Sequence, residues 1–345
     1  MASDLALGHP PTLRLRIIVL GTCLVLANLG IWIWALVLFR HSPVLLGNAL
    51  IAYGFGLRHA VDADHIAAID NVTRQLIQMG KRPLTLGLWF ALGHSTLVVI
   101  AAFSTIMLSH ALQDRLEAWR NIGGVISTVI SAAFLFILAL INLLVLLSTW
   151  KTYRNARKHP EEKPENIEKL LGQKGILARL LRPLFKLVSK SWHMFFLGFL
   201  FGLGFDTATE VSLLGLSASE ASRGIAVASI MIFPALFAAG MSLIDTADGV
   251  LMTGAYQWAF VDPLRKLRYN IAITLVSVLV ALVIGSIETL DLIADQFNAQ
   301  GTFWNIVSSL GDHFNTLGFV VIGMFALAWA GSAVIYRYGR RKQSV

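Results

Sequence analysis

Residues 58–65 place four side chains that are able to bind a metal within seven positions, in the order Arg-His-Ala-Val-Asp-Ala-Asp-His. The surrounding stretch is otherwise apolar, and an Asp at the centre of a bilayer costs about 3 kcal/mol on insertion scales. A bound or hydrated cation would offset that cost. Two imidazoles and two carboxylates suit divalent first-row metals such as nickel, cobalt and zinc, whereas soft metals select thiolates. The pattern therefore favours a metal site over a set of hydrogen bonds between helices.

Helical phase divides this group, because successive residues of one continuous helix are turned by about 100°. His59, Asp62 and His65 then lie on one face, which we predict to bind the metal. Asp70 returns to the side of His59, while Asp64 points away and is expected to meet a neighbouring helix. The roles of Asp64 and Asp70 stay open.

A second motif, Gly93-His94-Ser95, lies in another apolar stretch. Glycine allows two helices to approach closely, so His94 is expected to face residues 58–65. On its own the motif fits a polar packing contact as well as a metal ligand. Beside the first motif, it makes His94 a further candidate ligand.

Carboxylates form a third group in residues 204–210. Asp206 and Glu210 are four positions apart and share one helix face. Two like charges cannot stay buried and ionised without a cation or a shared proton. We predict that they form a second metal station or a relay, with Thr207 and Thr209 beside them. A bridge to Arg58 is the structural alternative.

The fourth motif begins at Gly240 and continues with Met, Ser and two carboxylates three positions apart, Asp245 and Asp248. Asp245 joins the predicted second station or relay. Asp248 is expected near a helix end, where contact with water explains it without any functional role. Its role therefore stays open.

The whole chain has the composition of a membrane protein. Of its 345 residues, 56% are hydrophobic and 14% are charged, whereas a soluble domain has about 25% charged residues. The single cysteine excludes an internal disulfide and a cysteine-rich metal site. The net charge of +8 comes from basic residues in loops, as membrane topology requires. We predict an all-α polytopic protein of the lipid bilayer, with no nucleic-acid partner.

Eight stretches reach the roughly 20 mostly apolar residues that a span needs. With both termini in the cytoplasm, 23 Lys and Arg residues lie on the cytoplasmic side and four on the other, which favours that orientation. We predict one transmembrane transporter domain over 1–345, in which spans 1–4 occupy 1–150, a basic cytoplasmic loop occupies 151–190 and spans 5–8 occupy 191–345. The predicted spans are 15–39, 46–72, 84–108, 122–149, 192–217, 224–250, 267–290 and 314–337.

The polar motifs recur in the same order in the two halves. Spans 2 and 3 carry Asp-Ala-Asp-His and then Gly-His-Ser, and spans 5 and 6 carry Asp-Thr-Ala-Thr-Glu and then Gly-Met-Ser. In the predicted orientation, span 2 runs inward and span 5 outward. This order is typical of an inverted repeat with its binding site between the halves.

These motifs resemble those of the NiCoT family of nickel/cobalt transporters, which is recognised by eight spans and four motifs. The resemblance covers nearly the whole chain, and the span 2 motif is the most specific part. The third-span motif has Leu97 where the family usually has Val, which is a conservative difference. The four matching segments are 58–66, 92–99, 203–210 and 240–245.

The resemblance implies secondary uptake of Ni²⁺ and/or Co²⁺, as substrate, across the bacterial cytoplasmic (inner) membrane, with no cofactor. It also implies that four residues are needed for transport: His59, Asp62, Asp64 and His65. Relatives that export these metals tend to carry a His-rich loop, which this chain lacks, so we expect uptake and keep efflux as the alternative. Substrate preference in the family is associated with spans 1 and 2, where Asn28 is a candidate selectivity residue. Nickel and cobalt are not distinguished.

The sequence contains no ATP-binding P-loop and indicates no ATPase subunit. Energy is therefore expected from an ion gradient or from the membrane potential, which is worth about 4.6 kcal/mol per 100 mV for a divalent ion. The coupling ion and the oligomeric state stay open. A membrane-embedded His-box metalloenzyme is the alternative from another class, but it needs several histidine boxes. Only His59, His65 and His94 lie well inside predicted spans, and the other six histidines lie near span ends or in loops.

Overall fold

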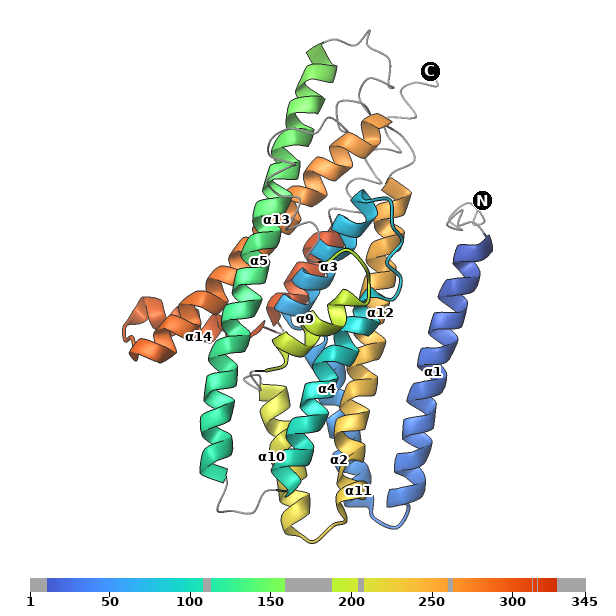
Figure 1. Cartoon of the computed structure of the whole chain (residues 1–345), viewed down its shortest axis with the longest axis vertical. Coiled ribbons are helices and arrows are strands. Elements are labelled where there is room, and N and C mark those ends of the chain that lie inside the picture. The colour runs from blue at the N-terminus through green and yellow to red at the C-terminus, as the bar shows by residue number, and fades with distance from the viewer. Residues whose placement is uncertain are drawn as a thin grey trace.

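The computed structural model describes residues 11–107, 113–158, 188–203, 208–259, 263–311, 313–314 and 316–327. Within these ranges the chain contains helices and no strand, which confirms the all-α class. Long helices lie side by side in an elongated bundle (Figure 1). The helices are α1 (Pro11–Phe39), α2 (Pro43–His59), α3 (Ala63–Gln78), α4 (Leu86–Met107), α5 (Gln113–Lys158), α9 (His193–Phe201), α10 (Ala208–Ser222), α11 (Val227–Ile230), α12 (Ile232–Ala259), α13 (Pro263–Phe297) and α14 (Thr302–Gly311).

Five helices in the described part are long and apolar enough to cross a membrane, and two bent helix pairs raise the number to at most seven. The predicted count of eight is therefore not confirmed. The predicted span 192–217 corresponds to α9 and α10, between which residues 204–207 lie outside the described part. Most of the predicted loop 151–190 and the end of the predicted span 314–337 also lie outside it.

Two central helices organise the bundle. α4 and α12 pack against each other, α2 and α3 pack against α12, and α9 and α10 pack against α4. α5 and α13 pair alongside them, and α1 lies at the rim (Figure 1). Large apolar side chains are exposed along α1, including Leu26 and Ile33, as expected for a surface that faces lipid.

The prediction of one continuous helix over 46–72 is wrong. α2 ends at His59 and α3 begins at Ala63, and the two helices are bent by 51°. Asp62 stands at the N-terminal cap of α3 with extended backbone (φ −64°, ψ 144°). Two turn hydrogen bonds use the amides at the break, from Val61 N to the Arg58 carbonyl (3.1 Å) and from Asp62 N to the His59 carbonyl (2.9 Å). A broken helix is tolerated inside a membrane where protein satisfies the freed backbone groups in this way.

Glycines bring α2 close to α12 and α9 close to α4. A Cβ on any of four glycines would collide with backbone of the partner helix, so each crossing depends on the missing side chain. Each of the four helices therefore contributes one glycine and one backbone position that the partner's glycine approaches. These two residues are three positions apart on every helix. The glycine–backbone pairs are Gly56 with Phe237 and Gly240 with Tyr53 between α2 and α12, and Gly198 with Phe90 and Gly93 with Phe195 between α9 and α4.

Candidate metal site

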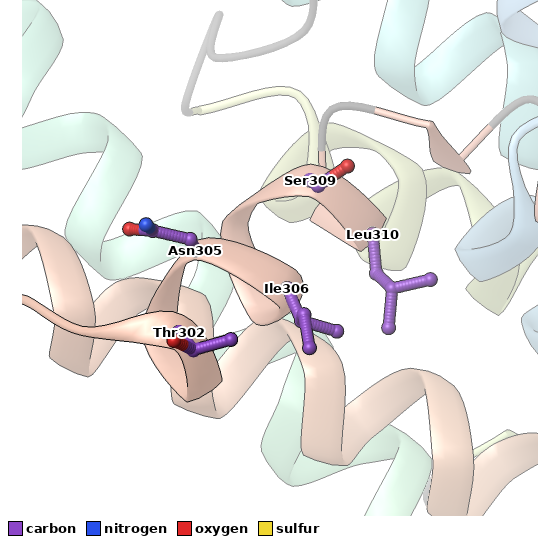
Figure 2. A pocket seen from close by; sticks show the side chains of 5 residues that line it. All are labelled: Thr302, Asn305, Ile306, Ser309 and Leu310. Atoms are coloured by element: carbon purple, nitrogen blue, oxygen red, sulfur yellow. The ribbon is translucent and has the colours of Figure 1, made fainter.

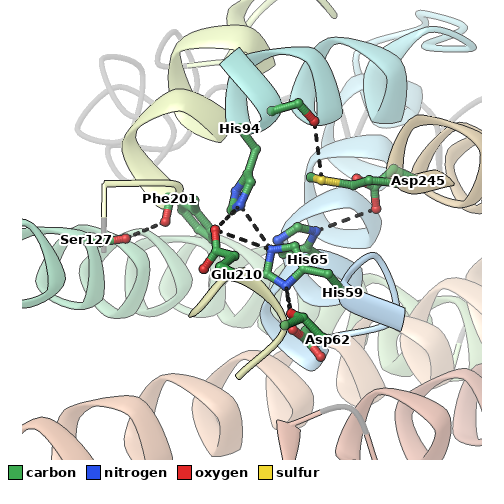
Figure 3. A network of polar contacts seen from close by, with 11 residues as sticks. His59, Asp62, His65, His94, Ser127, Phe201, Glu210 and Asp245 are labelled. Atoms are coloured by element: carbon green, nitrogen blue, oxygen red, sulfur yellow. Dashed lines mark hydrogen bonds and ion pairs between the residues drawn. The ribbon is translucent and has the colours of Figure 1, made fainter. Parts of the chain in front are cut away.

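Three histidines from three helices converge beside the break between α2 and α3 (Figure 3). His59 is the last residue of α2, His65 lies in the first turn of α3, and His94 lies within α4. One ring nitrogen from each lies within 4.8 Å of the others. The three side chains are almost fully buried, with 1–2% of their surface exposed. Bulk solvent therefore does not reach these nitrogens, and buried polar atoms of this kind need partners inside the protein or in a ligand.

The spacing of the converging atoms fits a small cation. His94 Nε2 lies 3.0 Å from His59 Nε2 and 2.8 Å from Glu210 Oε1. Ligands at right angles around a metal, with metal–nitrogen bonds of about 2.05 Å, are about 2.9 Å apart. His59 Nε2 and Glu210 Oε1 are 3.9 Å apart, as expected for ligands at a wider angle. Because His94 Nε2 can carry at most one hydrogen, it cannot donate to both neighbours, whereas a cation would satisfy all three atoms.

Asp62 contacts the opposite edge of the His59 ring. Its Oδ2 lies 2.9 Å from His59 Nδ1, and Thr209 Oγ1 lies 3.3 Å from the same nitrogen. An N–H at Nδ1 that donates to Asp62 leaves the Nε2 lone pair facing His94 and Glu210. Carboxylates orient metal-binding histidines in this way in many proteins. The geometry therefore gives Asp62 the position of a supporting residue for His59.

His65 and Asp245 form the other side of the cluster. His65 Nδ1 lies 3.6 Å from Asp245 Oδ1, which is too long for a hydrogen bond. Neither side chain makes a hydrogen bond among the described residues, although they are 1% and 0% exposed. Buried polar groups without a hydrogen bond cost about 1–3 kcal/mol each. A cation at this side of the cluster would remove that cost.

Two aromatic rings that sequence reasoning missed enclose the histidines. Phe90 packs against His65 with ring centres 4.8 Å apart, and Phe237 packs against His59 at 5.5 Å. Apolar walls lower the local dielectric and strengthen the attraction of a cation for its ligands. The sequence indicates these two residues only through their position, because each Phe stands three residues before the glycine of a polar motif.

The structure brings together most, but not all, of the predicted site residues. His59, Asp62, His65, His94 and Glu210 lie in one connected group, with Asp245 beside His65. Glu210 lies directly against His94, closer to the histidines than a separate second station would be. Its predicted partners Asp206 and Thr207 lie outside the described residues.

The remaining candidates occupy the surroundings of the group. Asp64 is half-buried in the first turn of α3, and Arg58 is exposed. Ser95 Oγ lies 3.6 Å from the Met241 sulfur, between α4 and α12. Asn28 accepts a hydrogen bond from the Tyr53 hydroxyl (3.0 Å), so it contacts α2 about one and a half turns before His59.

A surface cavity of about 390 Å³ along α14 lies apart from this group. Figure 2 shows its lining, which contains no charged side chain. Two hydroxyls, one amide and two aliphatic side chains supply no ligand set for a transition metal. The lining residues are Thr302, Asn305, Ile306, Ser309 and Leu310.

Comparison with known proteins matches residues 45–335 to the NicO family, described as high-affinity nickel-transport protein. A high-affinity nickel transport protein of Cupriavidus necator is 55% identical, over 98% of this chain and 95% of its own length. The nickel transporter NixA of Staphylococcus aureus is 44% identical over 87% and 88% of the two chains. The cobalt transport protein NhlF of Rhodococcus rhodochrous is 40% identical over 91% and 90%. No solved structure matches the chain.

Proposed function

Because the chain belongs to the NicO family of high-affinity nickel-transport proteins, we propose that it takes up Ni²⁺, with Co²⁺ as a second substrate, across the bacterial inner membrane. The family consists of transporters, so the chain is not an enzyme and nickel is its substrate rather than a cofactor. The His-box metalloenzyme is thereby excluded. The similarity to a cobalt transport protein supports Co²⁺ as the second substrate.

The observation that carries the proposal is the convergence of His59, His65 and His94 with Glu210 inside apolar helices. Mixed nitrogen and oxygen ligands favour nickel and cobalt over Mg²⁺ and Ca²⁺, which prefer all-oxygen shells. In this proposal His59, His94 and Glu210 bind the ion, Asp62 orients His59, and His65 with Asp245 forms the adjoining station. Release then proceeds toward the cytoplasm under the interior-negative potential.

An inverted repeat would provide the two states that such a carrier needs. The glycine crossing of α2 with α12 has the same spacing as that of α9 with α4, which supports the pairing of the two halves. In the first half the interrupted helix α2/α3 lies next to the site, and in the second half α9 ends at Phe201 and α10 begins at Ala208. Broken helices at repeat interfaces are common in secondary transporters. Residues 1–150 and 191–345 are proposed as the two halves of one domain, and the 23-to-4 distribution of Lys and Arg supports cytoplasmic termini.

Uptake by proteoliposomes that contain the purified protein tests the proposal. Radiolabelled nickel is expected to accumulate with saturation, and excess cobalt is expected to inhibit more strongly than manganese because the ligands are rich in nitrogen. An inside-negative potential should raise the rate, and an uncoupler should remove that gain. Liposomes without protein are the control. Uptake no greater than in those liposomes would exclude the function.

Substitution of Glu210 tests the ligand set. Glu210→Gln keeps the side-chain length but removes the charge beside His94, so the equilibrium affinity for Ni²⁺ is expected to fall at least about tenfold. Calorimetry on the detergent-solubilised protein measures this. Glu288→Gln is the matched control. Glu288 is also buried, but it contacts Ser131 on α5 and not the histidine cluster. Equal affinities in the two variants would contradict the assignment.

A further inference from the structure

α2 and α10 also contact each other far from the histidines. Asn48 Nδ2 on α2 donates to Glu220 Oε1 on α10 (2.9 Å), while His59 and Glu210 meet at the other end of the same two helices. The residue numbers rise along one helix as they fall along the other, so the two helices are antiparallel. Ten to eleven residues separate the two contacts, a distance of about 15 Å along a helix. A carboxylate thus stands at each end of the interface between α2 and α10.

Small buried residues occur on both helices between these ends. On α2, Ala49 and Ala52 are buried and Gly56 approaches Phe237 of α12, and on α10 Ser217 is fully buried. The Ser217 hydroxyl donates back to the Leu213 carbonyl (2.9 Å). Small residues keep the backbones close without filling the interface with rigid bulky groups. α2 and α10 therefore connect the position of Glu220 to the histidine cluster.

Glu220 is a buried carboxylate whose ion-pair partner is exposed. It is 2% exposed, whereas the side chain of its ion-pair partner Arg223 is 61% exposed. Both Arg223 Nη1 (3.2 Å) and Asn48 bind the same oxygen, Oε1, and among the described residues none binds Oε2. Because Arg223 is exposed, its guanidinium can move into water when another cation takes its place beside the carboxylate. The Asn48 amide would hold the carboxylate in place when that happens.

We propose that Glu220 is the outer recognition residue of the transporter, where a hydrated divalent cation replaces the Arg223 guanidinium before it moves along α2 and α10 to His59. This inference rests on the proposed uptake function and on the orientation given by the basic residues. Glu220 and Arg223 lie at the α10–α11 end of the bundle, opposite the end at which α1 begins (Figure 1). A carboxylate with water-mediated contacts raises the local cation concentration without selecting among metals. Selection is left to the imidazoles.

Two substitutions with opposite expected effects test this inference. Glu220→Gln keeps the length of the side chain and its acceptor for Asn48 but removes the charge, so KM for nickel uptake is expected to rise about tenfold. Arg223→Gln removes the competing cation, so KM is expected to fall about threefold. Equilibrium Ni²⁺ affinity of the histidine cluster should stay within about twofold of the parent in both variants. Proteoliposome uptake and calorimetry supply the two measurements.

A purely structural ion pair predicts a different pattern. Each substitution breaks that pair, so both would change KM in the same direction or leave it unchanged, and either result overturns the proposal. If Glu220→Gln fails to fold, Arg223→Gln alone decides, because a KM that is unchanged or raised overturns the proposal. Absence of uptake by the unsubstituted protein would instead reject the transport function itself.

Discussion

His59→Ala is expected to lower nickel uptake at low substrate concentration at least about 100-fold and to weaken equilibrium Ni²⁺ binding by a similar factor. His59 is the centre of the cluster, since its two ring nitrogens contact Asp62, Thr209 and His94. The substitution removes one imidazole ligand and also leaves the Asp62 carboxylate buried without its partner. Uptake by proteoliposomes and calorimetry in detergent measure the two effects.

His41→Ala is the matched control for this loss. His41 lies exposed in the turn after α1 and forms no part of the cluster, so uptake and binding should remain unchanged. Size-exclusion chromatography establishes that both variants fold. If folded His59→Ala binds and transports nickel as well as His41→Ala does, the three histidines do not form the transport site.

The sequence predicts which residues carry the chemistry better than it predicts the backbone that holds them. The motif at 58–65 identified His59, Asp62 and His65, and the structure places them together. Helical phase groups these residues only along a continuous helix, whereas the structure has a break between α2 and α3. Residues 60–62 are Ala-Val-Asp and contain neither Gly nor Pro; Asp62 is a favoured N-cap residue, but one such residue does not by itself predict a break. Contacts from other helices, including Thr209 with His59, accompany it instead.

Contacts between segments that are far apart in the sequence explain the other differences between the prediction and the structure. Spacing of four residues placed Asp206 and Glu210 on one face, but it could not show that Glu210 reaches His94, which is 116 positions away. Asn28 stands out in the sequence as a polar residue in an apolar stretch, but its contact with Tyr53 depends on how α1 packs on α2. Hydropathy identifies apolar stretches and not helices. A broken pair such as α2/α3 therefore makes the number of spans depend on whether the pair is counted as one span.

A substitution at the close approach of α2 and α12 is expected to have the second large effect on transport. Gly56→Ala is expected to lower the thermal midpoint by several degrees and uptake about tenfold or more, because the added Cβ would meet the backbone of Phe237 on α12. Backbone cannot rotate aside as a flexible side chain can, so α2 and α12 must separate. His59 follows Gly56 by one helical turn, and a shift of this kind displaces its ring from His94 and Glu210. Thermal unfolding in detergent and uptake by proteoliposomes measure both effects.

Gly54→Ala separates this collision from the general effect of replacing glycine in a helix. Gly54 lies on the same helix two residues earlier, and nothing stands within 4 Å of the position that its Cβ would take. Alanine stabilises a helix interior by about 1 kcal/mol relative to glycine, so Gly54→Ala should keep or raise the midpoint and leave uptake unchanged. The two variants differ only in what the new methyl group meets. Equal midpoints and equal uptake would mean that the close approach of α2 and α12 does not position the histidines.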